Sequence, residues 1–135
     1  MRLIRYSVGG RVACGIVEGE RVAELRGDLF DTLERTGTEH ALADVKVEVP
    51  LLPRTFYAAG LNYTDHIIEM AAKRGETPNI PQKPDMGYRA VNALIAHDEP
   101  VVIPRDATKV QYEGEIAVVI GKKAKHLSEA DAFCG

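Results

Sequence analysis

One stretch decides the fold and the chemistry expected of this sequence: Gln111-Tyr112-Glu113-Gly114-Glu115-Ile116-Ala117-Val118-Val119-Ile120-Gly121. Its second half is a nearly unbroken apolar run rich in Val and Ile, which is typical of a strand buried on both faces of a sheet. Glu113 and Glu115 stand at the head of this predicted strand. Because side chains alternate across a strand, both carboxylates are expected on one face, roughly 6–7 Å apart. Two like charges placed this way indicate a bound cation or a raised pKa.

The glutamate pair has two interpretations. A hard divalent cation such as Mg²⁺ prefers carboxylate oxygens, and the spacing of Glu113 and Glu115 lets both side chains bind one ion. The alternative is two solvated glutamates at the frayed start of a strand, which the residues taken alone favour slightly. As metal ligands, two carboxylates still need a third ligand, waters or substrate oxygens to complete an octahedral site.

A second candidate site lies on a helix predicted over residues 65–74. His66 and Glu69 are three positions apart, so they share a face of that helix. A carboxylate beside a histidine orients the ring and stabilises its charged form, as a general base requires. From spacing alone, an exposed His–Glu pair of small energetic value is the favoured alternative. The preceding Gly60-Leu61-Asn62-Tyr63 combines a glycine with polar and aromatic residues, a combination that often shapes a pocket before a helix.

Other polar residues carry weaker signals. Arg89 is a candidate clamp for a substrate carboxylate, and a surface arginine is an equally good interpretation. His40, His97 and His126 lie in polar, turn-like contexts that are typical of solvated side chains. Neither cysteine has a nearby histidine, which argues against a thiol nucleophile.

Composition is that of a globular protein. The 135 residues are 45% hydrophobic and 27% charged, with a formal net charge of −3, which suits one ordinary domain. Without a basic stripe or an apolar run of roughly 18–20 residues, neither nucleic acid nor a membrane is an expected partner. The first residues lack a signal-peptide pattern, and Cys14 and Cys134 lie far apart in dissimilar contexts. A cytoplasmic protein without disulfides is therefore expected.

Turn residues and apolar periodicity predict a small β-rich N-terminal subdomain over residues 1–49 and a second unit over residues 50–135. Asp28 is expected to cap a short helix that ends near Gly37. Strands are predicted at residues 3–8, 11–17, 21–25, 45–49, 55–59, 88–95 and 101–103, with a hairpin turn at Gly9-Gly10. Ser128 is expected to begin a helix that would reach barely one turn by Gly135, so we expect the chain to be part of a longer one.

Three segments resemble the fumarylacetoacetate hydrolase family. Gly60-Leu61-Asn62-Tyr63-Thr64-Asp65-His66-Ile67-Ile68-Glu69 resembles the family's G-x-N-Y-x-D-H-x-x-E segment. The stretch from Tyr112 to Lys122 is similar to its E-x-E-x-x-V-V-I-G-K strand, and residues 93–104 resemble the connecting A-L-I … P-I-x-x-P stretch. The order and spacing of the three agree over residues 50–135. Residues 1–49 resemble the small N-terminal domain that many bacterial members carry.

The resemblance implies a mixed α+β fold that is mainly β, with rolled mixed sheets around a central site, assembled as a homodimer. Glu113 and Glu115, with a later aspartate, would bind Mg²⁺, Mn²⁺ or Ca²⁺, and His66 with Glu69 would activate water. Asn62, Tyr63 and Arg89 would contact the substrate.

The substrate class implied is a small 1,3-dicarbonyl or 2-oxo acid, and the implied reaction is hydrolysis of a C–C bond. The alternatives are an isomerase or decarboxylase of the same family, similar to hydroxyhepta-dienedioate isomerase or oxaloacetate decarboxylase. From another class, the alternative is a truncated, non-catalytic module for assembly or small-acid binding.

Two departures from the family pattern matter. Arg89 occupies the position of a family lysine, and an arginine holds an anion but does not easily donate a proton. This moves the interpretation away from the acylpyruvate hydrolases. The family's third metal carboxylate would follow Gly135, so these residues alone would bind metal weakly.

Overall fold

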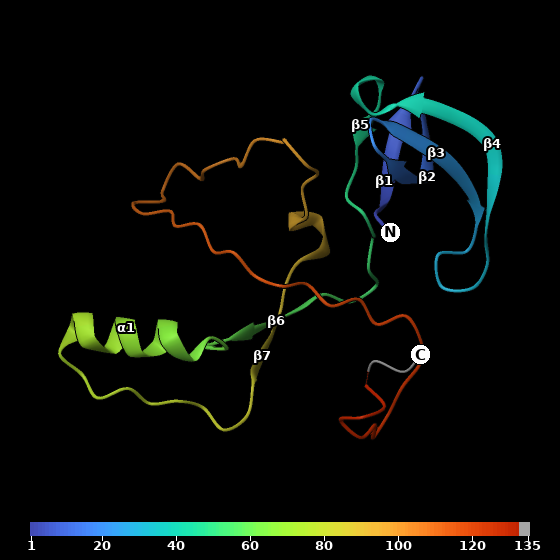
Figure 1. Ribbon diagram of the computed structural model, residues 1–135. Coiled ribbons are helices and arrows are strands. Elements are labelled where there is room, and N and C mark those ends of the chain that lie inside the picture. The colour runs from blue at the N-terminus through green and yellow to red at the C-terminus, as the bar shows by residue number, and fades with distance from the viewer. Residues whose placement is uncertain (133–135) are drawn as a thin grey trace.

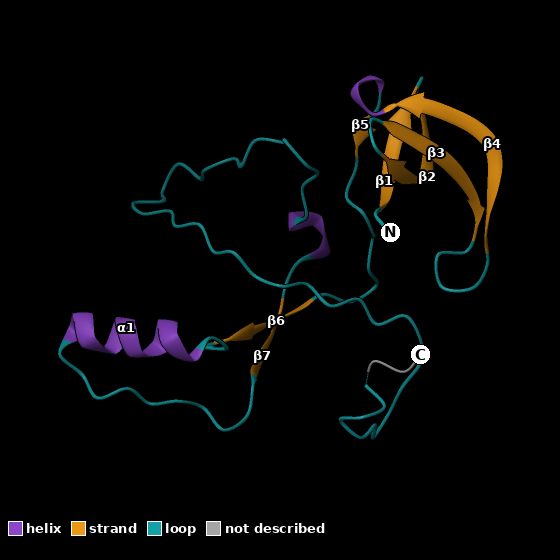
Figure 2. Ribbon diagram, viewed as in Figure 1, coloured by secondary structure: helices purple, strands orange, loops and turns teal. Residues whose placement is uncertain are grey.

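The structure, a computed structural model, describes residues 1–132 and divides into an N-terminal sheet and a looser second part (Figures 1 and 2). The sheet contains β1 (Leu3–Val8), β2 (Arg11–Glu18), β3 (Arg21–Gly27), β4 (Leu33–Ala41) and β5 (Lys46–Val47), with a 3₁₀ turn at Leu42–Asp44. The second part contains β6 (Tyr57–Gly60), α1 (Thr64–Arg74), β7 (Asp85–Tyr88) and a 3₁₀ turn at Val91–Ala93. Within the described residues, no helix is long and apolar enough to cross a membrane.

The N-terminal sheet is an antiparallel meander with strand order β4-β3-β2-β1-β5. Its first hairpin closes at Gly9 and Gly10, whose φ values of 56° and 78° suit the two-residue turn that matches strand twist. Val8 and Arg11 pair directly across it. The meander and the hairpin predicted from the sequence are therefore confirmed, and the predicted strand at residues 45–49 is the short β5.

The core of the sheet is built around Gly15. Tyr6 and Val22 are fully buried, and an ideal Cβ on Gly15 would lie 2.5 Å from Cγ1 of Val22 and 3.1 Å from Cε1 of Tyr6. Only a residue without a side chain lets these two groups meet over the β2 backbone.

A polar cluster lies in the same core. The buried carboxylate of Glu24 accepts a hydrogen bond from the Tyr6 hydroxyl at 3.1 Å and forms an ion pair with Arg11. The Arg11 hydrogen bond holds the pKa of Glu24 below its usual value. Burial, reinforced by Glu24, raises the pKa of Tyr6 to about 12. The buried charge is thus satisfied by partners on β1 and β2.

His40 lies half-buried against this core, so the prediction of a solvated side chain is wrong. β4 carries it opposite Val22, and its ring meets the Tyr6 ring edge-on with centroids 5.7 Å apart. Its Nε2 is buried without a hydrogen-bond partner among residues 1–132.

The helix predicted from Asp28 to Gly37 does not form. Asp28 accepts a hydrogen bond from the Phe30 backbone N–H at 2.8 Å, which closes a turn instead of capping a helix. The chain then enters β4, where cross-strand ion pairs join Arg26 to Glu34 and Arg21 to Glu39. Pairing along β3 outweighs a weak local helix preference.

The second part begins with the antiparallel β6–β7 hairpin and α1. The predicted helix is confirmed, and Gly75 ends it in the left-handed region, donating its N–H to Ala71 and Ala72. The strand predicted at residues 55–59 forms slightly later, as β6 (Tyr57–Gly60). The strand predicted at residues 88–95 is wrong, because β7 ends at Tyr88 and a 3₁₀ turn follows at Val91–Ala93.

The strands predicted at residues 101–103 and 111–121 are wrong, since no strand is present between residues 101 and 132. Ile116 is 84% exposed and Val118 69% exposed. An apolar sequence becomes a strand only where a neighbouring strand accepts its backbone hydrogen bonds, and no such strand lies beside it among residues 1–132. The Ser128 hydroxyl accepts a hydrogen bond from the Asp131 N–H, but the helix expected there is only a turn up to residue 132, and its continuation lies outside the described residues.

An ion pair joins the two parts of the structure. Lys46 Nζ on β5 donates to Glu99 Oε1 at 2.6 Å, and Glu99 Oε2 accepts the Ala96 N–H at 2.9 Å. The pair lowers the pKa of Glu99 and raises that of Lys46.

Replacing Gly15 by alanine should lower the free energy of unfolding by about 1–3 kcal/mol, since the new methyl group overpacks the core. Denaturant titration measures this change. Gly114→Ala is the matched control, because a Cβ at Gly114 meets nothing within 4 Å. Equal stability of the two variants would contradict the packing described for Gly15.

The pKa of Tyr6, raised from 10.0 to about 12, predicts an alkaline loss of stability. The folded state binds this proton more tightly than the unfolded state, so the stabilisation is complete below pH 10 and is lost as the pH rises towards 12. Denaturation at increasing pH should show a steeper decline for the unmodified protein than for Tyr6→Phe. The control Tyr112→Phe removes the hydroxyl of a fully exposed ring and should keep the decline.

Candidate functional site

The α1 helix carries the predicted dyad on its surface. His66 and Glu69 are both exposed, and the Glu69 carboxylate accepts a hydrogen bond from Lys73 Nζ at 2.5 Å. This hydrogen bond, followed by the lysine charge and a smaller contribution from His66, lowers the pKa of Glu69. An ionised carboxylate at this position is what a partner of histidine needs. The dyad itself stays a prediction.

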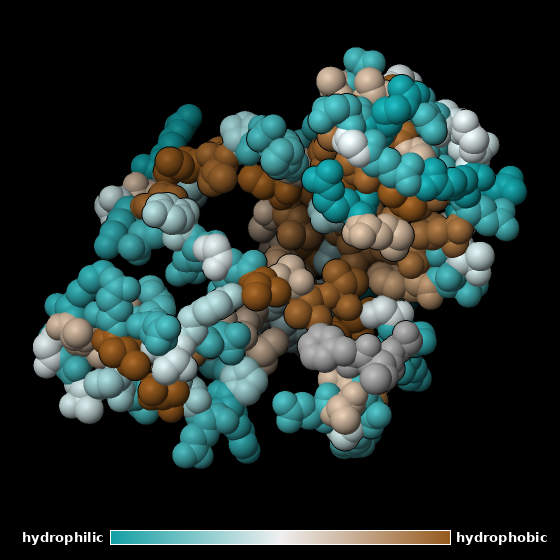
Figure 3. Space-filling view, viewed as in Figure 1, coloured by the Kyte–Doolittle hydropathy of each residue, from teal (hydrophilic) through white to brown (hydrophobic). Residues whose placement is uncertain are grey.

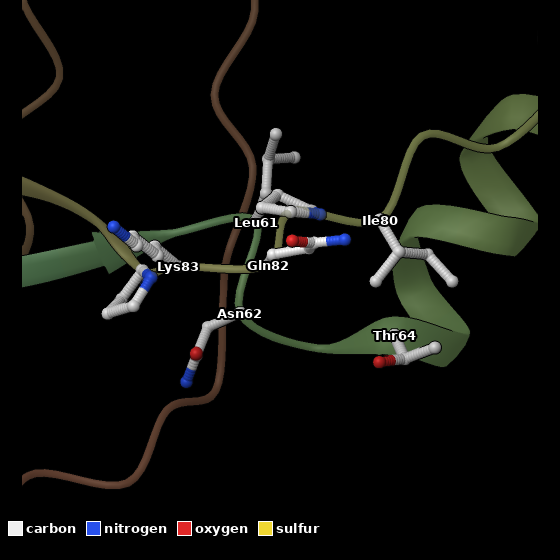
Figure 4. Close-up of a pocket in the computed structure, with 8 residues that line it drawn as sticks. Leu61, Asn62, Thr64, Ile80, Gln82 and Lys83 are labelled. Carbon is white, nitrogen blue, oxygen red and sulfur yellow. The ribbon is translucent and has the colours of Figure 1, made fainter.

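A small pocket lies where the β6–α1 connection faces the loop that leads into β7 (Figure 4). It encloses about 220 Å³, and its lining includes Asn62, a predicted substrate contact. Leu61 adopts a left-handed backbone with φ of 49°, which is uncommon for a residue with a side chain and shapes this connection. The complete lining is Leu61, Asn62, Thr64, Ile80, Pro81, Gln82, Lys83 and Pro84.

Sequence reasoning did not single out Gln82 and Lys83. Their only signal was the proline-rich loop that contains them, and a loop can be placed against the β6–α1 connection only in three dimensions.

Tyr63 connects the two motif-bearing segments. Its hydroxyl accepts a hydrogen bond from the Ile116 N–H at 3.2 Å, although the two residues are 53 positions apart. Ile116 directly follows Glu115, and Tyr63 directly precedes α1. The structure therefore brings the entry of the His66 helix to the glutamate segment. The role of Tyr63 as a substrate contact stays a prediction.

Glu113 and Glu115 lie exposed in an extended segment without regular pairing. Neither takes part in an ion pair within the described chain, so both carboxylates are free of cationic side chains. Two unpaired carboxylates are a donor set that fits a hard divalent cation. No group of three or more His, Cys, Asp or Glu residues suited to a metal is present among residues 1–132. Their role as ligands stays a prediction.

Arg89 continues the β6–β7 pairing. Its backbone N–H donates to the Phe56 carbonyl at 2.9 Å, while its guanidinium is exposed and reaches the Tyr88 carbonyl at 3.4 Å. The neighbouring Tyr57 and Tyr88 hydroxyls lie 3.0 Å apart, with ring centroids separated by 4.6 Å. No ion pair occupies the Arg89 guanidinium in the described part of the chain, and its role towards a substrate stays a prediction.

Comparison with known proteins places these segments in a family. The family model described as fumarylacetoacetate (FAA) hydrolase C-terminal matches residues 55–134. The chain belongs to the fumarylacetoacetate hydrolase family. A second family model, described as Rv2993c-like N-terminal, matches residues 1–50.

Protein Rv2993c of Mycobacterium tuberculosis is 33% identical over 139 residues, which cover 98% of this chain and 50% of that protein. A homoprotocatechuate catabolism bifunctional isomerase/decarboxylase of Escherichia coli is 35% identical over 121 residues, covering 87% of this chain and 27% of that protein. The crystal structure of Cg1458 has a TM-score of 0.78 at 30% identity, covering 97% of this chain and 48% of that one. The chain thus spans half or less of the length of these proteins. The similarity to the structure of Cg1458 confirms the predicted mainly β fold class.

Replacing Tyr63 by phenylalanine should release the Ile116 N–H, because the substitution removes the hydroxyl that accepts its hydrogen bond. Amide hydrogen exchange at Ile116 should accelerate several-fold. Tyr112→Phe is the matched control, since Tyr112 is fully exposed four residues away. Unchanged exchange at Ile116 in Tyr63→Phe would show that this contact does not hold the segment.

Proposed function

We propose that these residues form part of a divalent-metal-dependent enzyme that acts on a small 2-oxo or 1,3-dicarbonyl acid. The observation that supports it most is the hydrogen bond from the Ile116 N–H to the Tyr63 hydroxyl, in a chain of the fumarylacetoacetate hydrolase family. Through it the segment with the candidate metal ligands meets the start of the helix with the candidate base. Assembly as a homodimer, implied by the resemblance, belongs to the proposal.

Glu113 and Glu115 would hold the metal ion. Further oxygen ligands would come from the substrate, from water, or from residues in the part of the family's sequence that this chain does not span. When bound, such an ion polarises the keto-enolate oxygens of an acid and stabilises the negative charge that develops on them.

The protein's own groups would move the proton and orient the substrate. His66 would take a proton at its imidazole, and the Glu69 carboxylate, one turn along α1 and hydrogen-bonded to Lys73, would stabilise the imidazolium. Asn62 provides an amide at the pocket beside α1, and Arg89 offers an exposed fork of N–H groups for a substrate carboxylate. An arginine at that position binds the anion without releasing a proton.

Three reactions fit this arrangement. The bifunctional isomerase/decarboxylase relative supports a proton shift or loss of CO₂ next to the oxo group. The description of the matching family supports C–C hydrolysis, in which His66 would deprotonate water. Each reaction develops an enolate, so the same carboxylates and the same histidine would serve any of them.

The test compares His66→Ala with Glu115→Ala in the protein that carries these residues, with Mn²⁺ present. His66→Ala should lower turnover of oxaloacetate or an acylpyruvate by about 10²–10⁴ and leave Mn²⁺ affinity nearly unchanged, because a general base does not bind the ion. Glu115→Ala should lower both. His97→Ala, an exposed histidine outside the motif, is the control.

Activity that survives chelation and Glu115→Ala would overturn the metal-dependent mechanism. Equal loss of turnover and affinity in His66→Ala would assign that residue a structural role. The identity of the product distinguishes the reactions. Isomerisation gives a tautomer, decarboxylation gives a decarboxylated acid, and hydrolysis gives two cleaved acids.

A further inference from the structure

Gly87 lies beneath the guanidinium of Arg89 in the β6–β7 hairpin. An ideal Cβ on Gly87 would lie 3.3 Å from Nη1 of Arg89, which is tighter than an ordinary van der Waals contact. The same Nη1 donates a hydrogen bond to the Tyr88 carbonyl at 3.4 Å. Residues two positions apart share a face of a strand, so the arginine side chain folds back along β7 over the glycine.

The backbone does not require a glycine at this position. Gly87 lies within β7 opposite Ala58 of β6, and its φ is outside the left-handed region. Any residue can adopt this conformation, and a glycine inside a strand weakens the strand. A glycine in such a place often marks the close approach of another group. Here the group that approaches is the Arg89 guanidinium.

The folded-back side chain points to one end of the hairpin. β6 and β7 are antiparallel, with Gly60 opposite Asp85. Folding back over Gly87 turns the Arg89 guanidinium towards this end, where the chain continues into Asn62 and the pocket. Figure 3 shows polar side chains around a few apolar ones on the visible face of α1 and of the loop that leads into β7.

The backbone of Arg89 is held independently of its side chain. Its N–H donates to the Phe56 carbonyl at 2.9 Å, which continues the pairing of the two strands. A larger residue at position 87 would therefore move the guanidinium and leave the strand in place. All of these contacts lie within one hairpin, between residues 56–60 and 85–89.

We propose that Gly87 is a positioning residue that directs the Arg89 guanidinium towards the carboxylate of a substrate bound at the Asn62 pocket. Gly87 acts by leaving room for the guanidinium and touches neither substrate nor metal. The inference rests on the proposed function, in which Arg89 binds a substrate carboxylate. Two parallel N–H···O bonds require a fixed orientation of the guanidinium plane, so a side chain at position 87 that turns this plane away weakens binding.

The test uses Gly87→Ala and Gly87→Val in the protein that carries these residues, with Mn²⁺ present and oxaloacetate or an acylpyruvate as substrate. Gly87→Val should raise KM about tenfold, the lower end of the value of one hydrogen bond to a charged group. Its kcat should stay within about twofold, because the candidate base and the metal ligands are unchanged. Gly87→Ala should raise KM less, because a methyl group meets Nη1 alone, at the end of a flexible side chain.

Met86→Val is the matched control. Met86 precedes Gly87 in β7 and lies on the opposite face of the hairpin, so this variant should keep the KM of the unmodified protein. Valine favours strands more than glycine does, so Gly87→Val should not lose the hairpin. Circular dichroism and thermal denaturation check that each variant is folded.

A second pair of variants shows whether Gly87 acts through Arg89. Arg89→Ala should raise KM at least as much as Gly87→Val. Adding Gly87→Val to Arg89→Ala should raise KM no further, because the guanidinium that the valine displaces is already absent. A purely structural effect of the valine would instead add to the effect of Arg89→Ala.

The outcomes distinguish the two proposals. If the unmodified protein turns over neither substrate, the proposed function fails and this inference fails with it. If it is active and Gly87→Val or Arg89→Ala keeps the KM of the unmodified protein, the role of Gly87 is overturned while the metal-dependent reaction stands. A further rise of KM when Gly87→Val is added to Arg89→Ala would overturn it too, because the glycine would then leave room for something other than Arg89.

Discussion

Backbone hydrogen bonding is the constraint on which the whole structure depends. A strand must find a partner for its N–H and C=O groups, and the N-terminal residues find theirs in the neighbouring strands of one meander. The apolar segment that ends at Gly121 finds none among residues 1–132 and remains extended and exposed. The order of the N-terminal sheet and the openness of the glutamate segment have this common cause.

The sheet also tolerates a charge in its core. Glu24 is 8% exposed, yet its carboxylate is satisfied by the Tyr6 hydroxyl and by Arg11, whose guanidinium stays largely in solvent. An arginine that approaches from the edge stabilises a buried carboxylate without being desolvated itself. Gly15 makes this possible, because a side chain there would displace the Tyr6 ring and with it the hydroxyl.

Two contacts among residues 1–132 join the N-terminal sheet to the second part of the chain. Lys46 forms an ion pair with Glu99, which lies beyond the 3₁₀ turn Val91–Ala93, while Phe30 packs on Gly121 beyond the glutamates. Tyr63 adds a contact within the second part, between the start of α1 and Ile116. The N-terminal domain thus contacts segments that in the family pattern surround the chemistry.

The sequence alone predicted the meander, the Gly9-Gly10 turn and the α1 helix that ends at Gly75, because these depend on local geometry. It also predicted the family, because the family is marked by short motifs. The motif also brought His66, Glu69, Glu113 and Glu115 forward as candidates. Tertiary structure alone decided that the residues after Asp28 join the sheet as β4, and that His40 packs against Tyr6. It likewise showed that, among residues 1–132, the segment from Glu113 to Gly121 has no strand partner and contacts Tyr63 and Phe30. Strand pairing and packing depend on residues that are distant in the chain. A local sequence pattern does not show which distant residues will lie beside a segment.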